Sequence, residues 1–500
     1  MPLLLDPDAI ARLRADLRAA PYTAARCDEV LEAVAAGALA REQRLPAERA
    51  TRAHADPVAV LIRLFILGDP VDLRDADRAL PSLGSAGAIA LGLARIAGDA
   101  LIATSDLQPY GDENTDWWVA SDQGEIATRA PLRTDHVLGV GGASATLAAW
   151  TPRPRVSRAL DLGTGCGVQA LHLAGHADRI VATDLSTRAL AYAAFNAALN
   201  EQEWELRTGS MLEPVAGERF GLIVSNPPFV ITPRDAHVPT YEYRDAGGHG
   251  DDTVQALVAG LGEHLEPGGI AQILANWEVS DGGDWRNRIG AWAQCAGVDA
   301  WVVLREIQDP GQYAETWARD GGQQSGTADY ARMYASWLDD FASRSVTGVA
   351  FGVVTLHRPT VERVPFVELT DARGPVTGPM GPVIERGIAA RSWLAEHDDD
   401  AVLDATWTVA QDVTVEHHYR PGEAEPRVIV ARQGGGLRVT DRLDTVGAAL
   451  LSVCDGDLSA RAALVAIAAL LDLDADEVRA EQTPRLRGWI ADGLIVAATG

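Results

Sequence analysis

Two short motifs carry the residues best suited to chemistry. Residues 160–167 read LDLGTGCG and residues 224–229 read VSNPPF, and each motif includes or follows the end of an apolar run typical of a strand. In the second motif two prolines restrict the backbone, so the Asn226 side-chain oxygen and the Pro227 carbonyl can both accept hydrogen bonds from one NH2 group. The pattern therefore predicts a rigid clamp for a planar nitrogen.

The clamp indicates which reaction to expect. Its two acceptors would turn the nitrogen lone pair toward a methyl sulfonium, while the Phe229 ring stacks on the flat amide or base. Catalysis would then consist mainly of orientation in a near-attack geometry. We therefore predict methyl transfer from S-adenosyl-L-methionine, with Asn226, Pro227, Pro228 and Phe229 as the catalytic residues.

The glycine motif predicts the cofactor site. Glycines between a strand and a helix let the backbone approach a cofactor closely, although any α/β protein can place a tight turn there. About twenty residues later, Asp184 ends the next strand, where a carboxylate can accept hydrogen bonds from both ribose hydroxyls. The motif is neither a phosphate-cradling loop nor the dinucleotide form, and Asp161 before the glycines suits a methionine ammonium. A dehydrogenase is thus the weaker alternative.

Together, DLGTGCG, TDLS (residues 183–186) and SNPPF resemble class I S-adenosylmethionine-dependent N-methyltransferases of the small methyltransferase domain group. That group includes HemK-type glutamine-N5 methyltransferases of release factors and amino methyltransferases of RNA and DNA bases. The resemblance covers residues 129–359 and implies a Rossmann-like fold. The expected cofactor-binding residues are Asp161, Gly163, Thr164, Gly165, Gly167, Asp184, Leu185, Ser210, Met211, Asn226, Gly141 and Ser144.

Two of these regions are less typical of the group. Many relatives have an acidic residue after the third strand to contact the adenine, whereas this chain has Ser210 and Met211, which could substitute with weaker affinity. The segment 139–144, with Gly141 and Ser144, lies where relatives close over the cofactor, and a flexible turn is the alternative there.

Hydrophobic periodicity predicts a doubly wound α/β sheet over residues 129–360, flanked by helical, winged-helix-like N- and C-terminal modules. The resemblance implies that this sheet is a Rossmann-like class I methyltransferase sheet. In the N-terminal module, residues 1–128, the pieces 100–104 and 117–120 flank a polar turn at 111–114 and predict a small hairpin, or wing. The expected strands of the sheet are 158–162, 179–183, 222–224, 269–275, 300–306 and 349–356, with helices at 169–174 and 187–199 among others.

A Pro- and Gly-rich stretch at 374–382 predicts a linker into an α+β C-terminal module, residues 361–500. Its expected elements are a helix at 384–394, strands at 413–419 and 427–431, a helical run over 446–471, and a winged-helix-like end in which 486–490 is followed by 493–496. The length of 500 residues agrees with several domains.

Composition limits the class of protein. With 47% hydrophobic and 23% charged residues the chain is expected to be globular. No apolar run of eighteen residues and no basic-then-apolar N-terminus is visible, so we expect a cytoplasmic protein without a membrane partner. The four cysteines are far apart and share no C-x-x-C pairing, and we expect no metal. Oligomeric state is left open.

Charge favours a protein or peptide substrate over a nucleic acid. The formal net charge is −27, and nucleic-acid binding depends on neutralising phosphates, although the acidic charge can also simply serve solubility. The residues near the clamp are largely acidic, namely Asp235, Glu242, Asp245, Asp251 and Asp252, with only Arg234 and Arg244 opposing them. The leading hypothesis is a glutamine-type amide in a protein.

Two alternatives stay open for the function. Adenine N6 or guanine N2 of RNA or DNA presents the same NH2 group to Asn226, and a non-catalytic cofactor-binding scaffold is the third reading. Residues 241–245 are equally suited to gating the substrate or to a solvated loop. The tripeptide Gly-Gly-Gln at 321–323 matches the one that release factors present for methylation, and chance explains it in a chain with 48 glycines.

Overall fold

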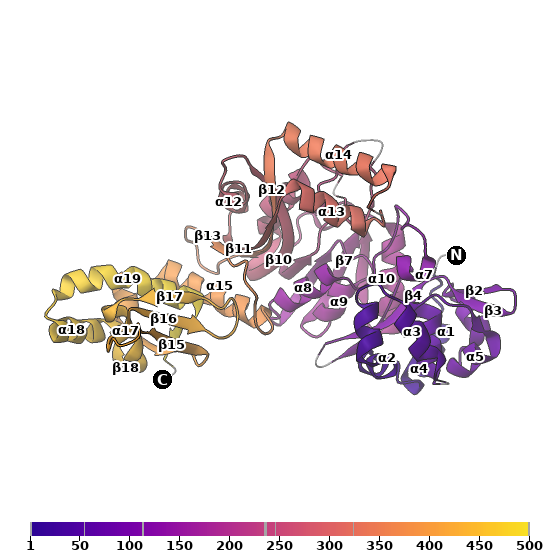
Figure 1. The fold of residues 1–500 in the computed structure, drawn as a ribbon, viewed down its shortest axis with the longest axis horizontal. Helices are drawn as coiled ribbons and strands as arrows, with labels where there is room; N and C mark the ends of the chain where they lie inside the picture. Colours follow the sequence, from indigo (N-terminus) through magenta and orange to yellow (C-terminus); the bar gives the residue numbers. More distant parts are fainter. Residues whose placement is uncertain are drawn as a thin grey trace.

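The computed structural model describes residues 3–54, 56–112, 115–234, 238–245, 247–323 and 325–498. Three parts of the chain follow one another along the long axis, with the N-terminal part at one end and the C-terminal part at the other (Figure 1). A large sheet lies between them and is covered by helices on both faces. No helix of these described ranges combines the length and the apolar character that a membrane span requires.

The central sheet has eight strands in the order β13-β11-β12-β10-β9-β6-β7-β8. Its strands are β6 (Val156–Leu162), β7 (Ala177–Asp184), β8 (Trp204–Thr208), β9 (Phe220–Ser225), β10 (Leu265–Ser280), β11 (Asp299–Gln308), β12 (Val346–His357) and β13 (Val367–Asp371). Its helices are α8 (Gly142–Trp150), α9 (Val168–Leu173), α10 (Thr187–Leu199), η2 (Glu213–Val215), α11 (Asp252–Leu261), η3 (Gly262–His264), α12 (Trp285–Cys295), α13 (Pro310–Asp320) and α14 (Ala328–Ser343).

This topology confirms the predicted Rossmann-like α/β fold. Strands β6, β7, β8, β9 and β10 run parallel, whereas β12 runs antiparallel to both neighbours. All six residues of β9 are buried, as expected for a central strand that is covered on both faces. The direction of chain progression reverses at β6, and such a switch point is where open α/β sheets bind ligands.

Six strands lie where the sequence predicts them, and two were not anticipated. Strand β8 lies at the edge of the sheet and has no fully buried residue, and its sequence WELRT mixes apolar with charged residues, so its apolar signal is weak. Strand β13 pairs in parallel with β11 and lies beyond residue 360. The central sheet therefore continues past the boundary that hydrophobic periodicity placed at residue 360.

The N-terminal part is mostly helical. Its elements are α1 (Pro7–Ala19), α2 (Ala24–Leu39), α3 (Leu45–Arg52), α4 (Pro57–Leu61), the π-helical turn η1 (Ile62–Ile66), β1 (Val71–Asp72), α5 (Leu73–Ala79), α6 (Gly84–Ala90), β2 (Ala94–Ala97), β3 (Ala100–Ala103), β4 (Asp106–Gly111), β5 (Asp116–Ser121) and α7 (Glu125–Thr128). Its strands form two small sheets, β1-β3-β2 and β4-β5.

The predicted pairing of 100–104 with 117–120 is wrong. Strand β3 pairs with β2 across a tight turn at Gly98, whose positive φ of 63° suits glycine. Strand β5 pairs instead with β4, whose polar and proline-containing sequence hides its strand character. The polar turn at 111–114 joins β4 to β5, and two of its residues, 113 and 114, lie outside the described ranges.

The C-terminal part mixes short strands and helices. Its elements are α15 (Gly381–Glu396), α16 (Asp399–Asp404), β14 (Thr406–Val409), β15 (Val413–His418), β16 (Val428–Gln433), β17 (Thr440–Leu443), α17 (Thr445–Ser452), β18 (Asp455–Ser459), α18 (Ala460–Leu471), α19 (Ala475–Asp492) and β19 (Ile495–Ala497). They include the sheets β18-β14-β19 and β15-β16-β17.

The predicted helical run over 446–471 is not continuous. Strand β18 interrupts it and pairs with β14. Gly456, between two aspartates, has a positive φ of 94°, which is not a helical conformation. The three-part domain division and the winged-helix likeness of both end modules stay predictions.

Candidate active site

The predicted cofactor loop and the predicted clamp leave neighbouring strands at the same edge of the sheet. Leu162, the last residue of β6, is in register with Thr183 of β7 on one side and with Ser225 of β9 on the other. The Ser225 hydroxyl donates a 2.7 Å hydrogen bond to the Leu162 carbonyl. The residues that follow these strands, from Gly163, Asp184 and Asn226 onward, therefore share one site.

The three glycines of the loop have two different roles. Their φ angles are +72° at Gly163, +56° at Gly165 and +93° at Gly167, a region that favours glycine. A Cβ at Gly163 or Gly165 would meet no atom within 4 Å, so these two positions border open space. A Cβ at Gly167 would lie 2.5 Å from the Trp204 ring, so this glycine serves close packing. The first two leave their backbone open to the close approach of a cofactor.

Asp161 supports the loop from within. Its Oδ2 atom accepts a 2.6 Å hydrogen bond from the Thr164 hydroxyl and a 2.9 Å bond from the Ala170 N–H. The residue is 1% exposed, and burial raises the pKa of the Asp161 carboxyl to about 7. Its predicted proximity to a methionine ammonium stays a prediction, whereas its role in holding Thr164 and the start of α9 is visible in the structure.

Asp184 is tied to the loop at the end of β7. Its two oxygens accept 2.8 Å hydrogen bonds from the N–H groups of Gly165 and Ser186, and burial raises the pKa of this carboxyl. Each carboxylate oxygen has a second lone pair for a ribose hydroxyl. The next side chain, Leu185, is 71% exposed and offers an apolar surface beside the carboxylate.

The remaining predicted cofactor residues lie on loops around this site. The Gly209 N–H donates to the Asp184 carbonyl at 3.1 Å, which places Ser210 and Met211 directly after this contact. Met211 has a positive φ of 45°. Gly141 is the N-cap of α8, and the Ser144 carbonyl in its first turn accepts a 2.8 Å hydrogen bond from Gln169 of α9. Their roles toward a cofactor stay predictions.

The clamp contains a buried acceptor without a partner. In the described ranges the Asn226 Oδ1 atom is buried and makes no hydrogen bond. Pro227 is buried, and the half-buried Phe229 ring meets the edge of Trp317 at 6.1 Å and of Phe351 at 6.5 Å between centroids. Most buried polar side-chain atoms in proteins are hydrogen-bonded, so a free acceptor at this point is suited to a ligand N–H.

Comparison with known proteins identifies the central region. Residues 139–304 match the family model described as the methyltransferase small domain. This central part of the chain is similar to the methyltransferase small domain. Residues 19–104 and 385–497 match two families described as domains of unknown function, DUF7059 and DUF7782.

Curated relatives of two kinds match part of this chain. The release factor glutamine methyltransferase of Xylella fastidiosa is 38% identical over 131 residues, which cover 24% of this chain and 47% of that protein. Ribosomal RNA small subunit methyltransferase C of Escherichia coli is 31% identical over 172 residues, which cover 34% of this chain and 45% of that protein. The chain thus spans about half the length of these relatives.

Solved methyltransferase structures also match. A methyltransferase from Pyrococcus furiosus aligns at 15% identity with a TM-score of 0.26, covering 43% of this chain and 81% of that one. A 16S rRNA methyltransferase of T. thermophilus in complex with AdoMet and guanosine aligns at 21% identity with a TM-score of 0.26, covering 46% of this chain and 63% of that one.

Two helices that the sequence did not predict pack beside the clamp. Helices α13 and α14, between β11 and β12, pack on residues 229–231. The Tyr313 hydroxyl accepts from the Ile231 N–H at 2.8 Å, and the Trp337 indole donates to the Ile231 carbonyl at 2.8 Å. The four-residue spacing of Tyr313 and Trp317 marks one helix face in the sequence, yet only the fold shows that it meets Phe229.

Residues 241–245 are fastened to the end of α13. Tyr241 donates to the Gly321 carbonyl at 3.2 Å, and Tyr243 donates to Asp320 at 2.7 Å. Arg244 donates to the Trp317 carbonyl at 2.8 Å, which places a cation at a helix C-terminus. The reading as a solvated loop is therefore wrong, although gating stays a prediction. The tripeptide at 321–323 begins at this contact.

The predicted acidic rim is only partly present. Asp245 is buried and accepts hydrogen bonds from Thr232 and from the Tyr241 N–H. Asp251 is buried and paired with Arg288. Glu242 and Asp252 are exposed, and residue 235 lies outside the described ranges. Charge counted along the sequence overstated the negative surface, because two of these carboxylates are buried and hydrogen-bonded within the fold.

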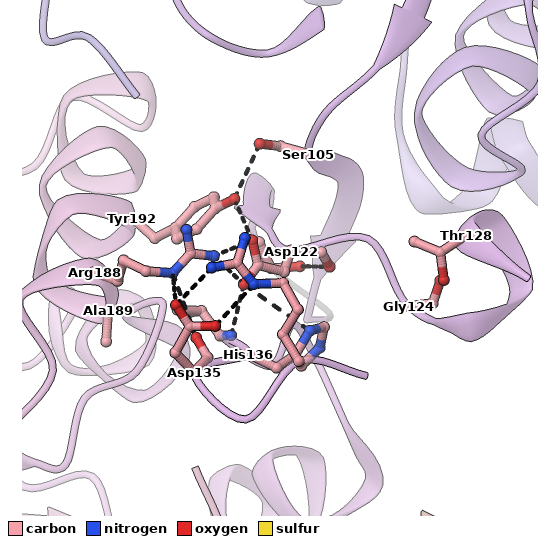
Figure 2. Close-up of polar contacts among 12 residues, drawn as sticks. Ser105, Asp122, Gly124, Thr128, Asp135, His136, Arg188, Ala189 and Tyr192 are labelled. Atoms are coloured by element: carbon pink, nitrogen blue, oxygen red, sulfur yellow. Dashed lines mark hydrogen bonds and ion pairs between the residues drawn. The ribbon is translucent and has the colours of Figure 1, made fainter. Parts of the chain in front are cut away.

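A cluster of polar residues joins the N-terminal part to the cofactor side of the domain (Figure 2). Asp122, which follows β5, accepts hydrogen bonds from Arg188, from Tyr192 at 2.9 Å and from the Val137 N–H at 2.8 Å. The His136 ring lies 5.9 Å from that of Tyr243, and burial lowers the His136 pKa. The segment before α8 is thereby held between α10 and the residues near the clamp.

Proposed function

We propose that this chain is an S-adenosylmethionine-dependent N-methyltransferase that acts on a planar amide or amino nitrogen. The observation that carries the proposal is the buried Asn226 Oδ1 atom, which has no hydrogen-bond partner among the described residues. Asn226 directly follows Ser225 at the end of β9, and Ser225 is hydrogen-bonded to Leu162 at the end of β6, just before the glycine loop. A buried acceptor left without a partner costs about 1–3 kcal/mol, and a substrate N–H would remove that cost.

The residues present fit the cofactor. Gly163 and Gly165 border open space, and Asp184 retains acceptor capacity for ribose hydroxyls beside the exposed Leu185. S-adenosylmethionine supplies an electrophilic methyl group when bound. No basic side chain is needed at the glycines, which agrees with a cofactor that carries no phosphate.

The chain's own contribution is orientation and exclusion of water. Asn226 Oδ1 and the Pro227 carbonyl would accept both N–H bonds of the target group, which fixes the direction of its lone pair. The ring of Phe229, backed by Trp317 and Phe351, would cover one face of the planar group. Orientation of this kind can lower a barrier without any acid or base of altered pKa.

A glutamine-type amide of a protein or peptide is the substrate class we favour. The release factor glutamine methyltransferases among the relatives and the net charge of −27 support it. The second candidate is the amino group of a nucleobase, which the ribosomal RNA methyltransferases among the relatives support. The two groups present the same NH2 geometry to Asn226.

Transfer of a labelled methyl group into cell lysate tests the proposal. The wild-type chain, Asn226→Ala and the control Asn287→Ala, an exposed asparagine of α12, are each supplied with methyl-labelled cofactor. Label that needs Asn226, tolerates Asn287→Ala and is released by protease supports a protein substrate. Label that is released by nuclease instead supports the nucleobase. Absence of label with every variant contradicts an active transferase and favours the scaffold.

A further inference from the structure

The N-terminal part docks on α10 through a regular series of hydrogen bonds. Asn196 donates to the Ala120 carbonyl at 2.9 Å and accepts from the Ala120 N–H at 2.8 Å. Asn200 does the same with Trp118, at 2.8 and 2.9 Å. One turn earlier on the same face, the Tyr192 hydroxyl donates to Asp122 at 2.9 Å (Figure 2).

The spacing of helix and strand explains this regularity. Four residues of an α-helix rise about 6 Å, and two residues of a β-strand extend about 6.7 Å. Positions 192 and 196 of α10 and its C-cap, position 200, therefore match in spacing positions 122, 120 and 118 of β5 and the residue that follows it. Among the described residues, strand β5 is paired with β4 on one edge only. On its other edge, the side-chain amides of the two asparagines bond the N–H and carbonyl groups that a neighbouring strand would otherwise bond.

Asn196 makes one more hydrogen bond, and it enters the glycine loop. Its Nδ2 atom also donates to the Cys166 carbonyl at 2.7 Å, between Gly165 and Gly167. Asn196 is 0% exposed and Cys166 is 2% exposed, so water does not compete for this bond. One side-chain amide thus joins the backbone of β5 to the backbone of the loop.

We propose that Asn196 is a positioning residue of the cofactor site, through which the N-terminal part of the chain holds the glycine loop in its binding shape. The loop has three glycines with positive φ angles, and because glycine can adopt many backbone conformations, such a loop keeps one shape only when its surroundings fix it. The inference rests on the proposed function, since it takes the loop as the cofactor site.

Asn200 provides a matched control within the same series. It makes the same pair of bonds to β5, but its further donation goes to the Asn196 carbonyl and not to the loop. A residue that only docks the N-terminal part should behave like Asn200. A positioning residue should also change the loop.

The test compares full-length wild type, Asn196→Ala and Asn200→Ala. Hydrogen exchange is followed at the amides of residues 163–167 without ligand, where the N–H groups of Gly163, Thr164, Gly165 and Gly167 are hydrogen-bonded. We expect Asn196→Ala to exchange about tenfold faster there than Asn200→Ala, and to bind S-adenosylmethionine about tenfold more weakly in calorimetry. In both variants, hydrogen exchange at residues 116–121 should be faster than in wild type.

Equal loop exchange and equal affinity in the two variants would overturn the proposal. Asn196→Asp and Asn200→Asp form a second, isosteric pair, which keeps the accepting oxygen and removes the N–H donors. Failure of both Asn196 variants to fold, with both Asn200 variants folded, would also overturn it, since Asn196 would then be a folding residue. A wild type that binds no S-adenosylmethionine contradicts the proposed function, while loop exchange still decides the role of Asn196.

Discussion

The Ser225 hydroxyl donates a 2.7 Å hydrogen bond to the Leu162 carbonyl, and this bond fastens the strand before the clamp to the strand before the glycine loop. Both residues are buried, and they are also in register within the sheet. A target nitrogen held at Asn226 and a cofactor held at residues 163–167 would therefore keep a fixed relative position. Fixed relative position is the main requirement of the proposed reaction.

Asp184→Ala is expected to weaken binding of S-adenosylmethionine. The variant would lose the proposed acceptors for the ribose, together with the two hydrogen bonds from the Gly165 and Ser186 N–H groups. We expect a loss of about 1.5–3 kcal/mol, the range for hydrogen bonds to a charged group. Calorimetry with the control Asp178→Ala, an exposed residue of the same strand, checks it. Equal affinity in wild type and Asp184→Ala would refute the assignment of this carboxylate.

Gly167→Ala is expected to destabilise the fold. The added methyl would need a φ near +93° and would contact the Trp204 ring. Overpacking and left-handed strain together should lower the free energy of unfolding by about 2–4 kcal/mol in urea titration. Gly175→Ala is the control, because no atom lies within 4 Å of its added Cβ. A Gly167 variant as stable as this control would show that the loop can move away from Trp204.

Asp161 should make stability depend on pH. Burial raises its pKa from an ordinary 3.8 to about 7, so the folded chain holds the proton more tightly than the unfolded chain. Its contribution to stability is full below pH 3.8 and is lost as pH rises through about 7. Relative to Asp161→Asn, the free energy of unfolding of wild type should fall between pH 5 and pH 7, by up to about 1.4 kcal/mol per pH unit.

Denaturant titrations of both chains at several pH values measure this difference. A difference between wild type and Asp161→Asn that stays constant from pH 5 to pH 8 would indicate that the Thr164 and Ala170 hydrogen bonds compensate the buried charge fully.

Local motifs allowed much of the site to be predicted, because glycine conformations and proline restrictions act within a few residues. The loop at 163–167, Asp184 and Asn226 could be named from the sequence, and the structure brings them to one edge of the sheet. Asn196 and Trp317 could not, since their partners at Ala120 and Phe229 are 76 and 88 positions away in the chain. Nothing local in the sequence specifies such contacts.

Errors in the predicted fold have the same origin. Strand β5 could be recognised from its own apolar residues, but its partner could not, because β4 contains Pro109 and two polar residues. The prediction of an acidic rim was wrong for Asp245 and Asp251. Their burial depends on Thr232 and Arg288, which reach them only in the folded chain.

The most direct test of the central claim is the steady-state kinetics of Asn226→Ala together with its affinity for S-adenosylmethionine. In the proposed complex the clamp would contact the target nitrogen and not the ribose or adenine, so kcat should fall by at least about a hundredfold while cofactor affinity stays within about twofold of wild type. The control Asn287→Ala should retain both values. A variant lacking Asn226 that keeps most of its turnover on the authentic substrate would contradict the account.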